Sequence, residues 1–282
     1  MTVARKSPPK RGSDGAPGVV LLGGGRITGA LLAGLRLAGY NEPIVVHDRN
    51  PGKLRQLRRQ YGVTVEPRLD RALAQAHLLI VAVRPDSVRE VLQEVKQIPH
   101  PQIAISLAAG IPLAKLRAGM GKTSGKRVRW ARAMPSPVAR SGRALTALLF
   151  EPDFPAAARR EVWNFFAKVG GVLEIPESKF DAFTVTYSSS HGYHALAALA
   201  EAAQHLGLDH KTALTAAAHA LADGILAWRE GDVSLNELLR EAATPGGIAA
   251  TTMASMDRSG YKRIVQRGLR AGMSRAKKNA KG

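Results

Sequence analysis

Short apolar runs alternate with longer stretches of mixed polarity through the first two thirds of the chain. The runs are rich in Val, Ile and Leu, a composition typical of strands buried on both faces of a parallel sheet. The predicted strands are 19–22, 44–46, 78–83, 103–107, a run around Val128, 146–150 and 171–175, and the predicted helices are 27–38, 52–60, 86–97 and 155–168. This alternation predicts an α/β fold with a Rossmann-like, doubly wound parallel sheet.

The pattern changes after Pro176, where strand-like runs give way to alanine-rich helical sequence. Breaks at 207–209 and 230–232 divide this sequence into several helices. Helices so poor in large side chains bury little surface by themselves, so we expect an all-α dimerisation domain that pairs with a second copy, as a homodimer or a higher homo-oligomer. The predicted organisation is a basic tail (1–17), a dinucleotide-binding domain (18–176), a helical dimerisation and substrate domain (177–275) and a basic tail (276–282).

Composition limits the classes of function. The chain has no cysteine, which excludes disulfides, thiolate nucleophiles and cysteine-ligated metals. No apolar run reaches the roughly 18 residues of a membrane span, and no secretory signal follows the N-terminal basic residues, so we expect a cytoplasmic protein without membrane contact. The net charge of +19 could attract nucleic acid, but no nucleic-acid-binding motif accompanies it and a solvated basic face is favoured.

A glycine-rich turn follows the first predicted strand. Gly23 and Gly25 occupy the first two positions of the G-x-G-x-x-G/A fingerprint, while Thr28 stands at the third. The first glycine makes the tight turn, the second lets a pyrophosphate approach the backbone, and the following helix directs its amides at the phosphates. We therefore predict that Gly23, Gly25, Arg26 and Ile27 contact a dinucleotide.

The end of the second predicted strand carries two conflicting signals for the cofactor. Asp48 can accept hydrogen bonds from an adenosine ribose, the arrangement usual for NAD. Arg49 can instead pair with the 2′-phosphate of NADP, and Asn50 serves either cofactor. The positive charge of the chain favours NADP(H) over NAD(H).

Six segments, in order, resemble motifs of the pyrroline-5-carboxylate reductase family, and the resemblance extends from residue 18 to 275. GGGRI resembles the family's GGGNM, DRNPGKL its DRNPEKL, AVRP its AVKP, ISLAAGI its SIAAGI, RAMP the start of its RxMPNTP, and TPGGIAATT its SPGGTT. The resemblance implies hydride transfer from NAD(P)H to a cyclic imine carboxylate, as in proline biosynthesis. It places the nicotinamide beside Ala82, Val83, Arg84 and Pro85 and beside Ala108, Ala109 and Gly110.

The resemblance also implies a substrate loop in which the amides of Gly246 and Gly247 hold the substrate carboxylate, with Thr244, Thr251 and Ser190 as further substrate contacts. Three departures from the family converge on the substrate side. Ala249 replaces the family's imine-binding threonine, 136–138 replaces its NTP, and 188–194 reads SSSHGYH in place of SGSGPAY.

These departures leave the proton donor open. His191 and Tyr193, with Ser190 as a further option, are the candidate replacements for the threonine, because imidazole and phenol can donate a proton within hydrogen-bond reach. His191 can equally be a helix-capping residue. His191 and His194 are spaced to share a metal, but no third ligand is recognisable, so no metal is expected.

Two other functions remain open. A homologue that binds NAD(P) without reducing a substrate, in a regulatory or nucleic-acid-binding role, needs only the dinucleotide site. A hydroxy-acid reductase needs a suitably placed lysine, and Lys179 and Lys211, the lysines between 170 and 260, lie in no recognised motif.

Overall fold

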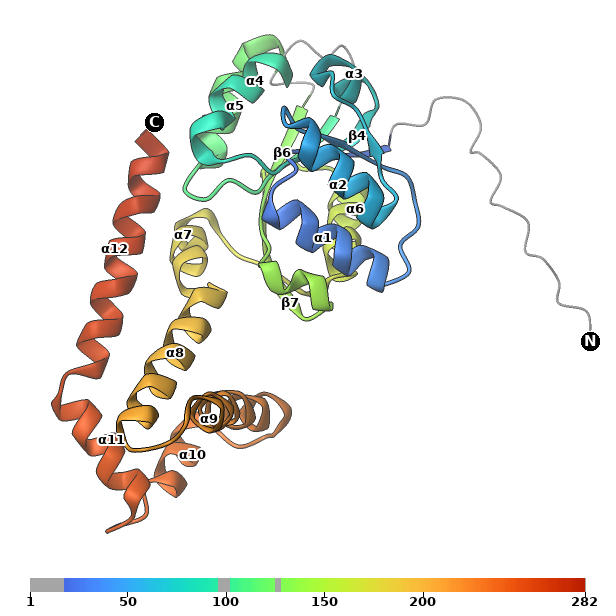
Figure 1. Cartoon of the computed structure of the whole chain (residues 1–282). Helices are drawn as coiled ribbons and strands as arrows, with labels where there is room; N and C mark the ends of the chain where they lie inside the picture. The colour runs from blue at the N-terminus through green and yellow to red at the C-terminus, as the bar shows by residue number, and fades with distance from the viewer. Residues whose placement is uncertain (1–17, 96–101, 125–127, 282) are drawn as a thin grey trace, which may run out of the picture. The chain divides into compact units, whose positions relative to one another are not determined.

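The computed structural model describes residues 18–95, 102–124 and 128–281 (Figure 1). They form two compact units. One unit runs to Thr184 and also takes in the end of the chain from Ala276, and the other is Val185–Arg275. Residues 276–281, which the sequence analysis placed in a C-terminal tail, are the last residues of a helix and belong to the first unit.

The first unit is built on an eight-stranded sheet with the order β3-β2-β1-β4-β5-β6-β7-β8. The strands are β1 (Gly18–Leu22), β2 (Ile44–His47), β3 (Thr64–Val65), β4 (Ala76–Val81), β5 (Gln102–Ser106), β6 (Val128–Met134), β7 (Ala144–Phe150) and β8 (Gly170–Glu174). All pairings are parallel except that of β6 with β7. The chain order reverses between β1 and β4, and this reversal is the topological switch point of the sheet.

Helices cover both faces of this sheet. They are α1 (Arg26–Leu37), α2 (Pro51–Tyr61), α3 (Leu69–Ala74), α4 (Val88–Val95), α5 (Leu113–Ser124), α6 (Ala156–Ala167) and α7 (Glu177–Thr186), with 3-10 turns η1 (Pro85–Ser87) and η2 (Pro137–Ser141). Successive strand residues enter different cores: Leu21 joins one buried cluster, whereas Val20 and Leu22 join another. This is the two-faced burial that the continuous apolar runs predict.

The structure confirms the predicted α/β class and adds elements that the sequence did not reveal. The short β3, the short α3 and the glycine- and lysine-containing α5 carry weak periodic signals. The antiparallel pairing of β7 also differs from the expected all-parallel sheet. Only residues 135–143 join β6 to β7, and a connection this short cannot cross over the sheet to form a parallel pair.

Gly34 allows α1 to pack closely on η2. A Cβ at this position would lie 2.0 Å from the carbonyl oxygen of Ala139, whereas a Cβ at Gly29 on the same helix meets only the Tyr61 hydroxyl at 3.8 Å. We expect Gly34→Ala to lower the free energy of unfolding by about 1–3 kcal/mol through overpacking. Gly29→Ala should raise it by up to about 1 kcal/mol, because alanine favours helix. Urea unfolding of both variants checks this, and stabilisation by both would contradict it.

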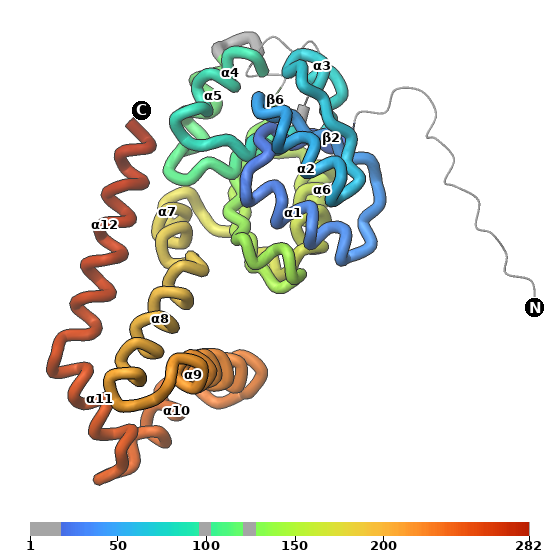
Figure 2. Tube along the Cα trace, in the orientation of Figure 1, coloured from blue at the N-terminus to red at the C-terminus, as the bar shows by residue number. Residues whose placement is uncertain are grey.

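The second unit is helical, and the tube in Figure 2 shows the course of its backbone. Its helices are the last residues of α7, then α8 (Ser189–His205), α9 (His210–Glu230), α10 (Leu235–Ala242), α11 (Ile248–Arg258) and α12 (Tyr261–Lys281) up to Arg275. The predicted breaks lie where α8 gives way to α9 and α9 to α10. Asp209 caps α9, because its side chain accepts hydrogen bonds from the amides of Lys211 and Thr212.

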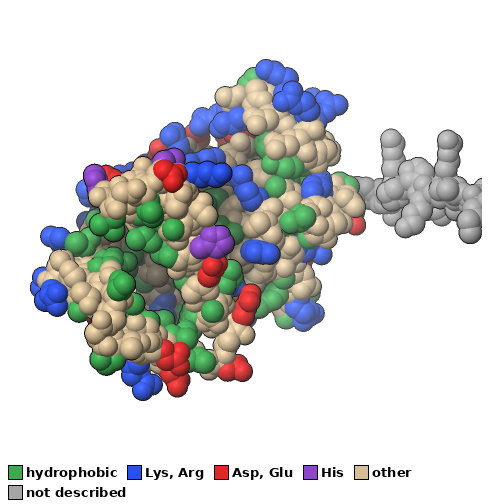
Figure 3. Space-filling view, turned by 60° about the horizontal axis from the view of Figure 1, so that its bottom comes forward, with side chains coloured by type: hydrophobic (Ala, Val, Ile, Leu, Met, Phe, Trp, Pro, Cys, Tyr) green, Lys and Arg blue, Asp and Glu red, His purple; other side chains and the backbone are tan. Residues whose placement is uncertain are grey.

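Large apolar side chains are exposed over this helical unit, and Figure 3 shows green side chains on one face of the molecule. They include Leu199, Leu206, Leu214, Ile225, Leu226, Trp228, Leu235, Leu239, Ile248, Ile264 and Val265. So many exposed large apolar side chains in one unit agree with the expectation that this unit pairs with another protein surface. Among the described residues, no helix combines the length and apolar character that crossing a bilayer requires.

Candidate active site

A cavity of about 970 Å³ lies in the first unit, beyond the carboxyl ends of β1, β2 and β4. It therefore opens at the switch point of the sheet, where open α/β sheets bind their ligands. Eight of the residues that the sequence predicts for cofactor binding line it: Gly23, Gly25, Asp48, Arg49, Asn50, Ala82, Val83 and Arg84.

The glycine turn at the end of β1 is built for close approach. Gly23 has a φ of +105°, and a Cβ there would lie 2.7 Å from the Ala82 carbonyl oxygen. Thr28, at the third fingerprint position, is fully buried and its hydroxyl donates to the carbonyl of Gly23. The threonine thus fastens the helix to the turn with a hydrogen bond.

Gly25 is the N-cap of α1 and supplies no side-chain hydrogen bond, and the first turn carries no acidic residue. The first amides of a helix lack intrahelical acceptors and lie at the positive end of its dipole. Arg26 is exposed at the start of this helix, whereas Ile27 packs against the core of the sheet. The helix start therefore presents an uncapped anion site to the cavity.

Asp48 connects the end of β2 to the glycine turn. Its Oδ2 accepts from the Gly24 amide at 2.7 Å, its Oδ1 accepts from the Asn50 amide at 2.8 Å, and Lys53 Nζ lies 3.6 Å away. Burial alone would raise the pKa of Asp48, but the two amides and the Lys53 ammonium hold its pKa below the ordinary value. The side chain is therefore a carboxylate at neutral pH and fixes the turn.

The cavity also has lining residues that the sequence analysis missed, among them His47, Lys53, Glu90 and Glu94. His47 is buried, and its Nδ1 lies 2.9 Å from the Glu66 carbonyl oxygen, which accepts the proton of this nitrogen. Glu90 and Glu94 lie one turn apart on α4, directly after β4. The sequence could have indicated both residues as cavity-lining, because they are four residues apart on one helix face and follow the AVRP segment.

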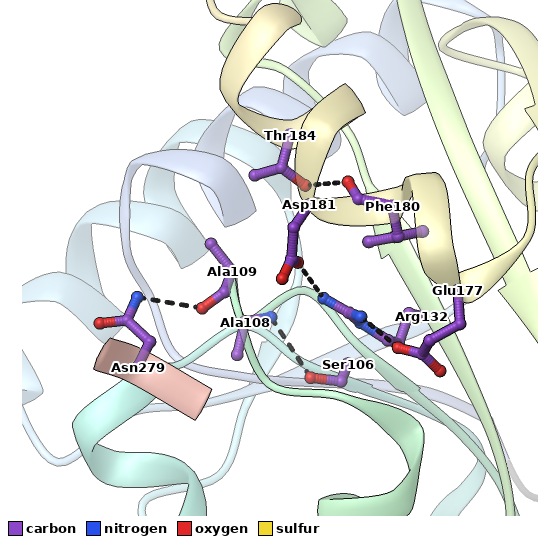
Figure 4. Close-up of polar contacts among 9 residues, drawn as sticks. All are labelled: Ser106, Ala108, Ala109, Arg132, Glu177, Phe180, Asp181, Thr184 and Asn279. Carbon is purple, nitrogen blue, oxygen red and sulfur yellow. Dashed lines mark hydrogen bonds and ion pairs between the residues drawn. The ribbon is translucent and has the colours of Figure 1, made fainter. Parts of the chain in front are cut away.

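The loop after β5 holds the predicted nicotinamide-side residues. The Ala108 amide lies 3.3 Å from Ser106 Oγ, and the Ala109 carbonyl accepts from Asn279 Nδ2 at 3.1 Å (Figure 4). Gly110 has a φ of +78°, and a Cβ there would lie 2.5 Å from the Ala276 carbonyl oxygen. The end of α12 therefore packs tightly on this loop, 170 residues along the chain from Ala109.

Arg132, at the end of β6, lies under α7 and is only 1% exposed. Its Nη1 donates to Glu177 at 2.5 Å and its Nη2 to Asp181 at 3.2 Å, and its guanidinium lies 4.1 Å from the centre of the Phe180 ring (Figure 4). The RAMP segment therefore has a structural task, which is to attach α7 to the sheet. Pro85 begins η1 and lines a separate cavity of about 580 Å³ beside α4 and α5.

The predicted substrate residues of the second unit lie at the beginnings of two helices. Ser188 caps α8, and its Oγ lies 2.7 Å from Ser190 Oγ. His191 Nε2 lies 2.8 Å from the Val185 carbonyl oxygen and donates to it, so this nitrogen already has a partner. The Tyr193 side chain is 66% exposed, which leaves its phenol accessible.

The loop 244–247 leads into α11. Gly246 has a φ of +76°, and the Gly247 amide donates to the Thr244 carbonyl at 2.9 Å, so this amide closes the turn itself. The amides without intrahelical acceptors are those of the first turn, at Ile248, Ala249 and Ala250.

The two threonines of α11 are engaged as well. The hydroxyls of Thr251 and Thr252 donate to the carbonyls of Gly247 and Ile248, each four residues back and each at 3.0 Å. Neither hydroxyl is therefore directed away from its own helix. Within the described part of the chain, no group of three or more His, Asp or Glu side chains is arranged to hold a metal ion.

The sheet order, the glycine turn and the cavity at the switch point define a Rossmann-type, dinucleotide-binding protein. Residues 18–110 match the family model described as NADP oxidoreductase coenzyme F420-dependent. Residues 177–279 match the model described as pyrroline-5-carboxylate reductase dimerisation.

The chain is 30% identical to the pyrroline-5-carboxylate reductase of Mycobacterium tuberculosis, over 92% of this chain and 95% of that protein. It belongs to the pyrroline-5-carboxylate reductase family. The Pseudomonas aeruginosa reductase is 25% identical over 92% of this chain and 96% of that protein. The fold also matches the NADP-bound Plasmodium falciparum pyrroline carboxylate reductase, with a TM-score of 0.83, 17% identity, and coverage of 94% of this chain and 99% of that chain.

Proposed function

We propose that the protein is an NAD(P)H-dependent imine reductase that transfers hydride to a cyclic imine carboxylate, with pyrroline-5-carboxylate as substrate and proline as product. The observation that carries this proposal is the cavity at the switch point, lined by the glycine turn and by Asp48, in a member of this reductase family. A fold of this kind binds a dinucleotide across the crevice where the strand order reverses.

The proposed cofactor position follows the chemistry of the cavity. The pyrophosphate binds at the uncapped start of α1, where Gly25 leaves room and Arg26 adds positive charge. The adenosine end faces Arg49 and Asn50, and the nicotinamide lies toward Ala82–Pro85 and the 108–110 loop. The side chain of Arg49 favours NADP(H), because its guanidinium can pair with the 2′-phosphate.

The proposed substrate position uses the start of α11. The first-turn amides at Ile248 and Ala249 suit a carboxylate, and the first turn of α11 contains no acidic residue. Thr244 and Gly246 shape the turn that directs these amides. We propose that a second copy of the chain covers the exposed apolar side chains of the helical unit, which gives a homodimer.

The Ser190 hydroxyl already has a partner in Ser188 Oγ at 2.7 Å, which leaves two candidate donors for the proton of the imine nitrogen. Ala249 has no donor side chain where the family resemblance places a threonine, and the hydroxyls of Thr251 and Thr252 already donate to backbone carbonyls. Of the remaining groups, the Tyr193 phenol is exposed, while His191 uses Nε2 in a backbone hydrogen bond. We therefore favour Tyr193 as general acid, with His191 as the second candidate.

The test is NADPH consumption by the purified protein given pyrroline-5-carboxylate, with proline identified as product. We expect turnover within the common enzyme range of about 1 to 10³ per second. The missing threonine supports a second candidate function, a dinucleotide-binding homologue without reductase activity. NADPH binding without proline formation at any pH tested would favour that function and overturn the reductase proposal.

A further inference from the structure

The cavity contains an ion pair whose basic member, Arg49, is the proposed 2′-phosphate ligand and whose acidic member, Glu90, has no role in the proposed function. Arg49 Nη1 lies 3.0 Å from Oε1 and 3.2 Å from Oε2 of Glu90. Arg49 follows β2, and Glu90 lies on α4 after β4, so the pair connects two elements that line the same cavity. The guanidinium that would read a 2′-phosphate is therefore already bound to a carboxylate.

We propose that Glu90 is a cofactor-specificity residue that competes with the 2′-phosphate of NADP(H) for Arg49 and so allows the protein to use NAD(H) as well. The inference rests on the proposed function, since it assumes that the cavity binds a nicotinamide dinucleotide. Cofactor preference would then depend on two residues, the basic Arg49 after β2 and the acidic Glu90 on α4.

The charges of the two cofactors explain this competition. A phosphomonoester carries about −1.5 to −2 charges at neutral pH. When the 2′-phosphate binds Arg49, the Glu90 carboxylate either releases the guanidinium or stays next to the phosphate, whose charge is also negative. NAD(H) has a hydroxyl at this position, which leaves the ion pair intact and can donate to a carboxylate oxygen.

The other charged groups of the cavity do not remove this competition. Lys53 is 3.6 Å from Asp48, which it shares with two backbone amides, and Arg84 is 3.6 Å from Asp86. Glu94 lines the same wall one helical turn after Glu90, and it makes no ion pair with a described residue. Lys53 and Arg84 each lie beside their own carboxylate. Arg49 is therefore the cation whose ion pair with Glu90 determines how tightly the 2′-phosphate binds.

The size of the effect follows from the exposure of the pair. The Arg49 and Glu90 side chains are 74% and 64% exposed, and ion pairs in water contribute little free energy. We therefore expect Glu90 to change the preference between the cofactors by about threefold to tenfold rather than by orders of magnitude.

The experiment compares Glu90→Gln with Glu94→Gln, which removes the same charge from the same wall without breaking an ion pair to another residue that the structure describes. Dissociation constants for NADPH and NADH are measured by fluorescence titration at one ionic strength. We expect Glu90→Gln to tighten NADPH binding by about threefold to tenfold, and NADH binding to change by less than about twofold. Glu94→Gln should change the NADPH constant by less than about twofold.

A double-mutant cycle with Arg49→Ala distinguishes direct pairing from a general charge effect. If Glu90 acts through Arg49, Glu90→Gln gives no improvement in NADPH binding when Arg49 is absent. Three results would each overturn the inference without affecting the proposed function. They are an unchanged ratio of the NADPH and NADH dissociation constants in Glu90→Gln, an equal change in Glu94→Gln, and an undiminished effect of Glu90→Gln in the Arg49→Ala background. A wild-type protein that binds neither dinucleotide would overturn the proposed function and the inference with it.

Discussion

Replacing Gly25 by valine is expected to weaken NADPH binding by about 100-fold, because steric overlap with the pyrophosphate of about 3 kcal/mol corresponds to that factor. The position suits this test because the protein itself tolerates the change. Gly25 has φ −81° and ψ −174°, which any residue adopts, and an added Cβ meets no atom within 4 Å. The melting temperature should fall by no more than about 4 °C, because valine is a poorer N-cap than glycine but disturbs no native contact.

Gly29→Ala is the matched control for this variant. It lies one turn further along α1, where a Cβ meets only the Tyr61 hydroxyl at 3.8 Å, and it does not line the cavity. NADPH affinity of the control should remain within about twofold of wild type, since it adds no atom at the helix start. A Gly25→Val protein that is folded and binds NADPH with wild-type affinity would show that the pyrophosphate does not lie at the start of α1.

Replacing Arg132 by methionine should lower the free energy of unfolding by about 2–3 kcal/mol, somewhat less than the roughly 3–5 kcal/mol that breaking a fully buried ion pair costs. The guanidinium is buried, pairs with Glu177 and Asp181, and packs on the Phe180 ring. Methionine retains much of the volume but leaves both carboxylates without this partner. The two acidic side chains are 41% and 28% exposed, so water partly compensates them and keeps the loss below that of a fully buried pair.

Arg159→Met provides the matched comparison. Arg159 also pairs with one carboxylate, that of Glu174, and lies 4.7 Å from the centre of an aromatic ring, that of Phe150. Its side chain is 43% exposed, so its replacement should cost less than about 1 kcal/mol. Urea unfolding measures both variants. Equal losses would mean that burial does not decide the contribution of these arginines.

The sheet was predictable because its strands are buried on both faces and read as continuous apolar runs. The 78–83 run, for example, gave β4, and the glycine turn after 19–22 located the cavity. The antiparallel β7 was not predictable from such runs, because an apolar strand carries no mark of its direction. Its direction is set by the short 135–143 connection, which is too short for a parallel crossover. That length indicates an antiparallel pair only after the ends of both strands are known.

The candidate site was predictable in its backbone and less so in its side chains. The glycines have fixed positions in a motif, but the partners of Thr28 and Asp48 depend on the local geometry of the turn. The contact of Asn279 with Ala109 spans 170 residues and has no local signal. Glu90 resembled any acidic residue on a solvated helix until α4 was placed beside Arg49.

Transfer of deuterium is the most direct test of the central claim that this protein passes hydride from a nicotinamide to a cyclic imine carboxylate. The protein is given pyrroline-5-carboxylate and NADPH that carries deuterium at both C4 positions, and the proline formed is examined by mass spectrometry. The account predicts one deuterium in each proline molecule. Proline without the label, or bound NADPH with no proline formed, would contradict it.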